Sequence, residues 1–188
     1  MRKIGIYGGT FDPIHNAHMI LARQAREELD LEQVIFVPAA VSPFKQGPAA
    51  DGKARMRMLR AAIAKEPGFA ADDLELRRPP PSYTFDTIAH FQKELGAAEI
   101  HCLIGEDNVA GLPRWHRFDE LKRMVRFVVL NRTGRAPAHP YRTINRLIDI
   151  SATDIRKRVA SGRSIRYLVP TEVETIIRKG NLYRGQKQ

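Results

Sequence analysis

The 188-residue sequence contains a single cysteine, Cys102, so a disulfide within the chain is excluded. This cysteine lies in the apolar stretch IHCLIG, which predicts a buried structural thiol rather than a reactive one. No apolar run approaches the roughly 20 residues of a membrane-spanning helix, and the first residues follow a strand pattern rather than that of a secretion signal. We therefore expect a cytoplasmic protein without a membrane partner.

Aromatic residues are scarce, at 7%, and they do not alternate with basic residues as a stacking platform for single-stranded nucleic acid would require. The net charge of +10 attracts phosphates, but the lysines and arginines are spread along the chain. Nucleic acid is therefore not the expected partner. With 43% hydrophobic residues and no low-complexity tract, repeat or linker, residues 1–188 are expected to form one domain.

Buried-type strands and amphipathic helices alternate along the chain. The strand candidates are residues 3–8, 34–39, 73–77 (weaker), 100–105, 126–131 and 147–151. Residues 16–30 and 52–66 carry apolar side chains at helical spacing. Such alternation predicts an α/β, Rossmann-like fold with an open, mainly parallel, twisted sheet and helices on both faces.

Ligands bind such sheets at the carboxyl ends of the strands, so the following loops are candidates for the site. They are residues 8–15, 38–52, 78–83, 105–115 and 131–145. A helix is predicted from the S-x-x-D signal at Ser151 to about Ala160, and another from Pro170 to a stop at Gly180. This helical part, about 151–188, is expected to pack on the rest of the domain.

The segment GGTFDPIHNAH, residues 8–18, joins the first strand to the first helix. Gly8 and Gly9 allow backbone N–H groups to approach a phosphate closely, and Thr10 adds a hydroxyl. His15 and His18 are three residues apart at the helix entrance, where the helix dipole attracts anions. From these residues alone, a phosphate site and a purely structural histidine pair both remain open.

Several familiar catalytic signatures are missing. The segment lacks the Lys-Ser/Thr ending of a P-loop and the spacing of a dinucleotide fingerprint. The two histidines have no neighbouring glutamate of the H-E-x-x-H type, which argues against protein-bound zinc. No G-x-S-x-G elbow supports a serine nucleophile.

Together with its flanking strand and helix, GGTFDPIHNAH resembles the T/H-x-x-H nucleotidyltransferase signature, and specifically that of the nicotinate-nucleotide adenylyltransferases of the bacterial type. The resemblance extends over essentially the whole chain. Its further motifs, in order, are VPAAVSPFK, RMRML, PPSYTFDT, LIGEDN, LPRWH, ISATDIR and KGNLYR. It implies transfer of the adenylyl group of ATP to nicotinate mononucleotide, giving deamido-NAD and pyrophosphate in NAD biosynthesis. The acceptor phosphate is already ionised near neutral pH, so alignment and charge neutralisation would suffice without a covalent intermediate.

The resemblance also implies roles for individual residues. The catalytic set would be His15, His18 and Lys45. The ATP site would be formed by Gly8, Gly9, Thr10, Phe11, His15, His18, Gly105, Asp107, Ser151 and Arg156. The mononucleotide site would be formed by Lys45, Arg55, Tyr83, Thr84, Asp86 and Trp115.

Other roles remain open for some of these residues. Lys45 and Arg55 are alternatively solvated charges, and Asp107 alternatively caps a short helix. Ser151 would cap its helix and also border the phosphates. Trp115, taken alone, would fit a core position better, and the resemblance reverses that preference.

The sequence departs from the family pattern at Ala17, where glycine is usual, and at Glu106, where a small or neutral residue is common. No role is assigned to His116.

ATP chemistry implies Mg²⁺ held mainly by phosphates, with no protein metal site. Nicotinamide mononucleotide or another acceptor, such as phosphopantetheine, is an alternative substrate. A non-catalytic nucleotide- or RNA-binding protein is the alternative of another class. The sequence leaves the oligomeric state open and is compatible with a homo-oligomer.

Overall fold

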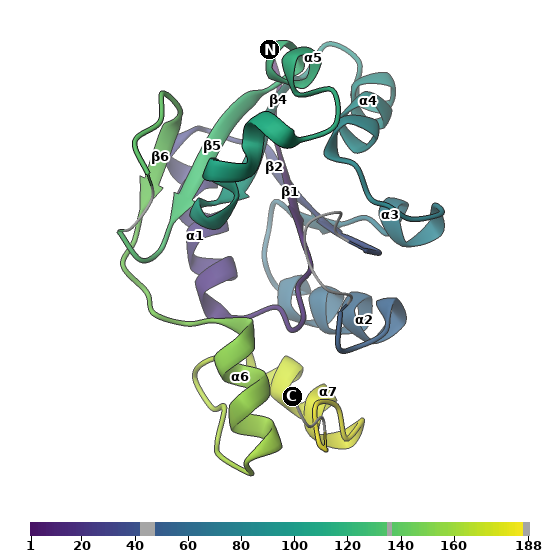
Figure 1. Ribbon diagram of the computed structural model, residues 1–188, viewed down its shortest axis with the longest axis vertical. Coiled ribbons are helices and arrows are strands. Elements are labelled where there is room, and N and C mark those ends of the chain that lie inside the picture. Colours follow the sequence, from purple (N-terminus) through teal and green to yellow (C-terminus); the bar gives the residue numbers. More distant parts are fainter. Residues whose placement is uncertain (42–47, 135–136, 186–188) are drawn as a thin grey trace.

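A computed structural model describes residues 1–41, 48–134 and 137–185. Six parallel strands form one sheet in the order β3-β2-β1-β4-β5-β6 (Figure 1). The strands are β1 (Lys3–Gly9), β2 (Gln33–Pro38), β3 (Phe69–Ala71), β4 (Glu99–Gly105), β5 (Arg126–Asn131) and β6 (Arg142–Asn145). The strand order reverses between β1 and β4, and a ligand site is expected outside the carboxyl ends of these two strands.

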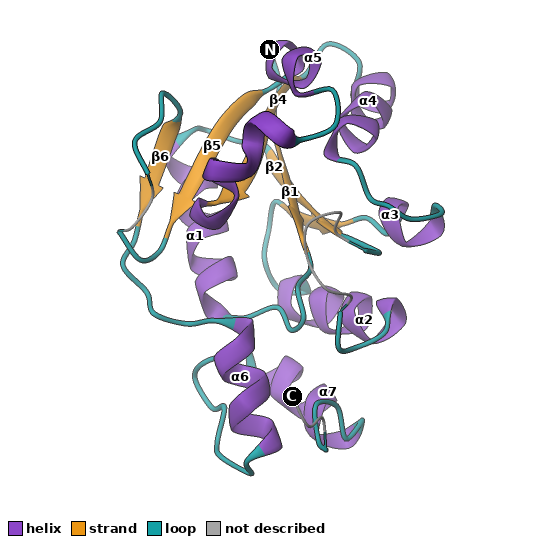
Figure 2. Ribbon diagram, viewed as in Figure 1, coloured by secondary structure: helices purple, strands orange, loops and turns teal. Residues whose placement is uncertain are grey.

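Helices flank the sheet on both faces, as the purple segments beside the orange strands show (Figure 2). They are α1 (Asn16–Glu28), α2 (Gly52–Ile63), α3 (Leu74–Arg77), α4 (Thr84–Leu95), the 3-10 helix η1 (Glu106–Arg114), α5 (Phe118–Met124), α6 (Ala152–Ala160) and α7 (Thr171–Lys179). The expected α/β, Rossmann-like fold with a parallel sheet is confirmed. Helices α1 and α2 begin at the positions that the sequence predicts.

Alternating strand side chains build two separate cores. Tyr7, Phe36 and Leu103 point to the face covered by α1, α2, α6 and α7. Ile6 and Cys102 point to the opposite face, which α4, η1 and α5 cover. Every central strand is thus apolar on both faces, as buried parallel strands are. The buried position predicted for Cys102 is confirmed.

The C-terminal helices pack on the first of these faces. Helix α7 contacts α2, and α6 lies beside α7 at one end of the molecule (Figure 1). Ser151 caps α6 by accepting a hydrogen bond from the Asp154 N–H at 3.1 Å, as its S-x-x-D signal predicts. Gly180 follows the last residue of α7, as predicted, whereas Pro170 precedes the first turn of α7 instead of lying in it.

Two strand predictions were wrong. In the predicted strand 73–77, residues 74–77 form α3 instead, because the Asp72 carboxylate accepts the Leu74 N–H at 2.7 Å and starts a helical turn. The third strand is the preceding Phe69–Ala71. Residues 147–151 are not a strand either, and Leu147 is 76% exposed.

The sixth strand, Arg142–Asn145, lies in a segment predicted to be a loop. Only Ile144 of its four side chains is buried, so it carries little of the apolar signal of a buried strand. Similarly, the predicted loop 105–115 contains η1.

Over the described residues, no helix is long and apolar enough to cross a membrane.

Candidate active site

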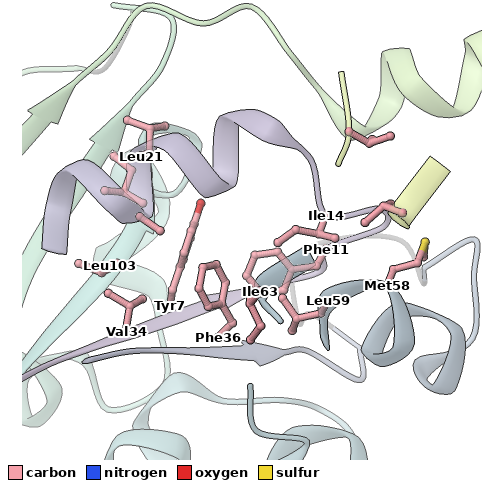
Figure 3. Packing of buried hydrophobic residues seen from close by; sticks show 14 of the residues in the cluster. Tyr7, Phe11, Ile14, Leu21, Val34, Phe36, Met58, Leu59, Ile63 and Leu103 are labelled. Carbon is pink, nitrogen blue, oxygen red and sulfur yellow. The ribbon is translucent and has the colours of Figure 1, made fainter. Parts of the chain in front are cut away.

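Two glycines, Gly8 and Gly9, shape the corner between β1 and α1. A Cβ at Gly9 would lie 2.9 Å from the Phe11 ring, whereas a Cβ at Gly8 would meet no protein atom within 4 Å. Phe11 has a left-handed backbone, with φ at 47°, and its buried ring packs against Tyr7 and Phe36 (Figure 3). Packing therefore requires a glycine at position 9, and the backbone at position 8 is left open for a ligand.

His15 and His18 lie side by side at the start of α1. Their rings are stacked with centroids 3.6 Å apart. The His15 N–H donates to His18 Nδ1 at 3.3 Å, which places the proton of a neutral His18 ring on Nε2. Burial, reinforced by the charge of Arg132, lowers the pKa of His15 to about 3. His15 is therefore neutral at physiological pH.

Asp12 connects this corner to two other parts of the chain. Its buried carboxylate accepts hydrogen bonds from the N–H groups of Ala49 and Ala50, at 2.6 and 3.2 Å, and from the Tyr183 hydroxyl at 2.7 Å. The Arg156 guanidinium donates to the Asp12 carbonyl oxygen at 2.8 Å. The loop before α2, the C-terminal segment and α6 are thereby fixed around the β1–α1 corner.

A cavity of about 640 Å³, here called the larger cavity, opens at this corner. This volume suits a nucleotide-sized ligand. Its wall includes all ten residues of the predicted ATP site, which are Gly8, Gly9, Thr10, Phe11, His15, His18, Gly105, Asp107, Ser151 and Arg156. These residues come from β1, α1, β4, η1 and α6, so the fold brings together segments that are far apart in the sequence.

The residues after β4 have a defined arrangement. Gly105 gives room to Asp107, whose Oδ1 would lie 2.6 Å from any Cβ at position 105. Asn108 Nδ2 donates to Asp107 Oδ1 at 3.1 Å and to the Gly105 carbonyl at 3.3 Å. Gly105 itself precedes η1, without a side-chain cap, so the alternative that Asp107 caps this helix is wrong. Asp107 instead lines the larger cavity.

A second cavity of about 120 Å³, here called the smaller cavity, lies on the other side of the β1–α1 corner. Tyr83, Thr84 and Trp115 line it as expected for a mononucleotide site, and His116 stacks on Tyr83 with centroids 4.5 Å apart. Tyr83, the residue before α4, does not cap the helix with its side chain, and the first N–H groups of α4 have no capping side chain among the described residues. Aromatic rings and a helix N-terminus suit a ring that carries an anionic group.

Two described residues of the predicted mononucleotide site, Asp86 and Arg55, are not among the lining residues. Asp86 is exposed on α4 and lines neither cavity. Arg55 is only 1% exposed and donates to the carbonyl oxygens of Thr10 and Ala39 at 2.7 Å each. Its guanidinium therefore fixes the backbone at the β1–α1 corner. The alternative that Arg55 is a solvated surface charge is wrong. Lys45 lies outside the described residues.

The two cavities share Gly8, Gly9, Thr10 and Asn108. Two ligands, one in each cavity, would therefore meet at the β1–α1 corner. This juxtaposition is the geometry that group transfer between two bound substrates requires.

Sequence reasoning missed four polar residues at the cavity walls. Arg132 and Asn108 line the larger cavity, while Glu75 and Thr87 line the smaller one. Burial raises the pKa of Glu75, although the Thr87 hydroxyl donates to its Oε1 at 2.6 Å. Arg132 and Glu75 belong to none of the motifs named above. Asn108 lies in LIGEDN and Thr87 in PPSYTFDT, so these two segments were the available signals.

The residues present do not build a metal cage. Among the described residues, no group of three or more His, Cys, Asp or Glu side chains could hold a metal ion. The oxygens of Asp12 accept the three hydrogen bonds given above, so this carboxylate is committed to the protein. A Mg²⁺ ion bound to the phosphates of ATP remains a prediction.

Comparisons with known proteins agree with this architecture. A family model described as cytidylyltransferase-like matches residues 6–158. Two relatives named "Probable nicotinate-nucleotide adenylyltransferase" are similar over nearly their whole lengths. The one from Exiguobacterium sibiricum is 40% identical, covering 96% of this chain and 98% of the relative. The one from Thermomicrobium roseum is 41% identical, covering 98% and 92%.

A solved structure shares the fold. Plasmodium falciparum nicotinic acid mononucleotide adenylyltransferase complexed with NaAD has a TM-score of 0.82 at 20% identity, covering 97% of this chain and 98% of that one. The structural likeness establishes the fold, and the relatives at about 40% identity establish the family. The chain belongs to the nicotinate-nucleotide adenylyltransferase family within the cytidylyltransferase-like proteins.

Proposed function

We propose that this protein transfers the adenylyl group of ATP to nicotinate mononucleotide, forming deamido-NAD and pyrophosphate in NAD biosynthesis. The observation that carries the proposal is the meeting of the two cavities at Gly8, Gly9 and Thr10. ATP occupies the larger cavity, and the nicotinate ring of the mononucleotide occupies the smaller one, with the phosphate directed to the shared corner. Family membership supports this assignment of substrates.

The reaction is an in-line displacement at the α-phosphorus of ATP. An oxygen of the acceptor phosphate forms the new P–O bond while the bond to the bridging oxygen of pyrophosphate breaks. The acceptor phosphate needs no general base because it is already ionised. The protein therefore contributes alignment and the neutralisation of negative charge.

The residues at the corner supply that neutralisation. His18 donates a hydrogen bond from Nε2 to a phosphoryl oxygen, and neutral His15 supports it by stacking and by its backbone N–H. The N-terminus of α6 and Arg156 border the leaving pyrophosphate. Lys45 adds a further positive charge in this proposal, and Mg²⁺ arrives with ATP.

Selectivity for nicotinate arises at the smaller cavity. The ring stacks against Tyr83 or Trp115, and its carboxylate accepts from the uncapped N–H groups at the start of α4. A carboxamide would lose the interaction with the helix dipole. We propose that nicotinamide mononucleotide is consequently the poorer acceptor.

The direct test incubates the purified protein with ATP, Mg²⁺ and either mononucleotide, and measures both pyrophosphate and the dinucleotide. We expect turnover with nicotinate mononucleotide and at least roughly tenfold lower kcat/KM with nicotinamide mononucleotide. A mock purification from cells that do not express the protein measures contaminating activity. Absence of turnover with either acceptor would overturn the proposed function, and equal turnover would overturn the proposed selectivity.

A further inference from the structure

Glu106 is a buried carboxylate directly after β4. Its Oε2 accepts hydrogen bonds from the N–H groups of Arg132 and Thr133, at 3.1 and 3.2 Å. These two residues follow the end of β5. A carboxylate in such a position is costly unless its charge is compensated, so the two N–H donors fix both the carboxylate and the backbone that it binds.

The backbone hydrogen bonds to Glu106 determine the position of Arg132. Its Nε is 4.0 Å from Glu106 Oε1, and its Nη1 donates to the carbonyl oxygen of Ile150, immediately before the cap of α6. Its side chain is 32% exposed and lines the larger cavity. Arg132 therefore joins the ends of β4 and β5 to the start of α6, and all three segments form the wall of that cavity.

The chemistry of this wall suits an anion. A guanidinium has five N–H donors in a planar fork that matches phosphate oxygens, and Ile150 accepts from only one of its nitrogens. The N-terminus of the nine-residue helix α6 lies beside it, with Ser151 and Thr153 also lining the cavity. The combined positive potential favours the phosphate chain over the neutral nucleoside.

We propose that Glu106 is a positioning residue for the nucleotide: it holds Arg132 at the wall of the larger cavity, where the guanidinium binds the phosphate chain. This inference rests on the proposed binding of ATP in that cavity. It assigns a role to a residue that the family pattern does not explain. A role of Glu106 in folding alone would leave phosphate recognition unchanged.

The two N–H groups share one oxygen of Glu106, and this allows a discriminating variant. Glu106→Gln retains an oxygen that accepts both hydrogen bonds but loses the charge, whereas Glu106→Ala loses the acceptor itself. If Glu106 acts by anchoring the backbone, Glu106→Gln retains the binding of the phosphate chain that Glu106→Ala loses. Glu120→Ala is the matched control, because Glu120 also pairs with an arginine, Arg117, but at the surface and outside both cavities.

Calorimetric titration with a non-hydrolysable ATP analogue and with adenosine, in the absence of acceptor, tests the proposal. We expect Arg132→Gln and Glu106→Ala each to weaken binding of the analogue at least roughly fivefold and that of adenosine less than roughly twofold. Glu106→Gln and Glu120→Ala should stay within roughly twofold of the unmodified protein. Glu106→Ala should add little to Arg132→Gln, because both changes remove one interaction.

Three results would overturn the proposal: equal losses for adenosine and the analogue, additive effects of the two changes, or unchanged binding in Glu106→Ala. Circular dichroism and thermal unfolding verify that each variant is folded. Should Glu106→Ala fail to fold, Glu106→Asp replaces it: this variant keeps the charge but draws the carboxylate back by one methylene from the two N–H groups, and it should weaken binding of the analogue more than that of adenosine. Because binding is measured without acceptor, a protein that binds the analogue but does not turn over contradicts the proposed reaction and leaves this inference standing.

Discussion

The imidazole rings of His15 and His18 are stacked, with ring centroids 3.6 Å apart and planes inclined by 17°. Two imidazolium cations at this separation would repel each other. Burial and the charge of Arg132 lower the pKa of His15 to about 3, so His15 stays neutral beside its partner. His15 therefore contributes a neutral ring to the stacked pair at physiological pH.

This relationship predicts a specific loss of stability in acid. In the unfolded chain His15 takes up a proton as the pH falls below about 6.5, whereas in the folded chain it does so only near pH 3. The folded state therefore loses stability between these values, by about 1.4 kcal/mol for each pH unit. Relative to His15→Asn, the unmodified protein should lose about 2 kcal/mol from pH 7 to pH 5. Urea unfolding of both proteins at pH 7 and pH 5 measures the free energy of unfolding. An equal change of this free energy in the two proteins would contradict the prediction.

His18→Ala should lower kcat by at least roughly tenfold, because it removes a donor to the charge that develops on the phosphoryl oxygens. The rings of Tyr7 and Phe11 also contact His18, so the folding of the variant must be verified by thermal unfolding. Steady-state kinetics at saturating ATP and mononucleotide give kcat. An unchanged kcat in a folded variant would remove His18 from the catalytic group.

Tyr183→Phe should destabilise the protein by about 1–3 kcal/mol, because it leaves the buried Asp12 carboxylate without one of its donors. Asp12 retains the N–H groups of Ala49 and Ala50, so the variant should still fold. Tyr167→Phe is the control, since Tyr167 is 75% exposed. Chemical denaturation of both variants measures the difference. Equal stability of the two would show that the Asp12–Tyr183 hydrogen bond contributes nothing measurable.

Glu75→Gln should change how stability depends on pH. Burial raises the pKa of Glu75 in the folded state, so this state keeps a proton that the unfolded chain has already lost. The folded protein is therefore destabilised as the pH rises from the usual carboxyl range to the raised pKa. The Gln variant keeps an acceptor for Thr87 but does not titrate. Its stability relative to the unmodified protein should rise with pH, and a constant difference from pH 4 to pH 8 would contradict this.

The central strands could be predicted because each buries both faces. Ile4, Ile6 and Ile100 belong to near-continuous apolar runs that no helix pattern explains. The edge strands β3 and β6 could not be predicted, because they are short and mostly half-buried or exposed. The alternating apolar residues of 73–77, and residues 147–151, which are more apolar than β6, drew the prediction away from them.

The candidate site likewise contains residues that the sequence predicts and residues that it does not. The glycines, histidines and ISATDIR segment carry local signals, and these residues meet in the larger cavity. Arg132 and Glu75 carry no such signal, because their positions depend on partners far away in the sequence. Of the two departures from the family pattern, Glu106 anchors the backbone at Arg132. Ala17 is fully buried at the wall of the larger cavity, and nothing in the structure explains the extra methyl group.

Trp115→Ala should mainly weaken acceptor binding, because Trp115 lines the smaller cavity and not the larger one. The KM for nicotinate mononucleotide should rise at least roughly fivefold through loss of ring stacking, while the KM for ATP changes less than roughly twofold.

Trp115→Phe is the matched variant, because it keeps an aromatic ring beside Phe127, whose ring Trp115 meets edge to face at 6.4 Å. Trp115→Phe should retain most of the affinity for nicotinate mononucleotide. Varying each substrate at saturation of the other separates the two KM values. A rise in the KM for ATP alone would contradict the placement of the acceptor in the smaller cavity, because the two cavities meet only at the β1–α1 corner and Asn108.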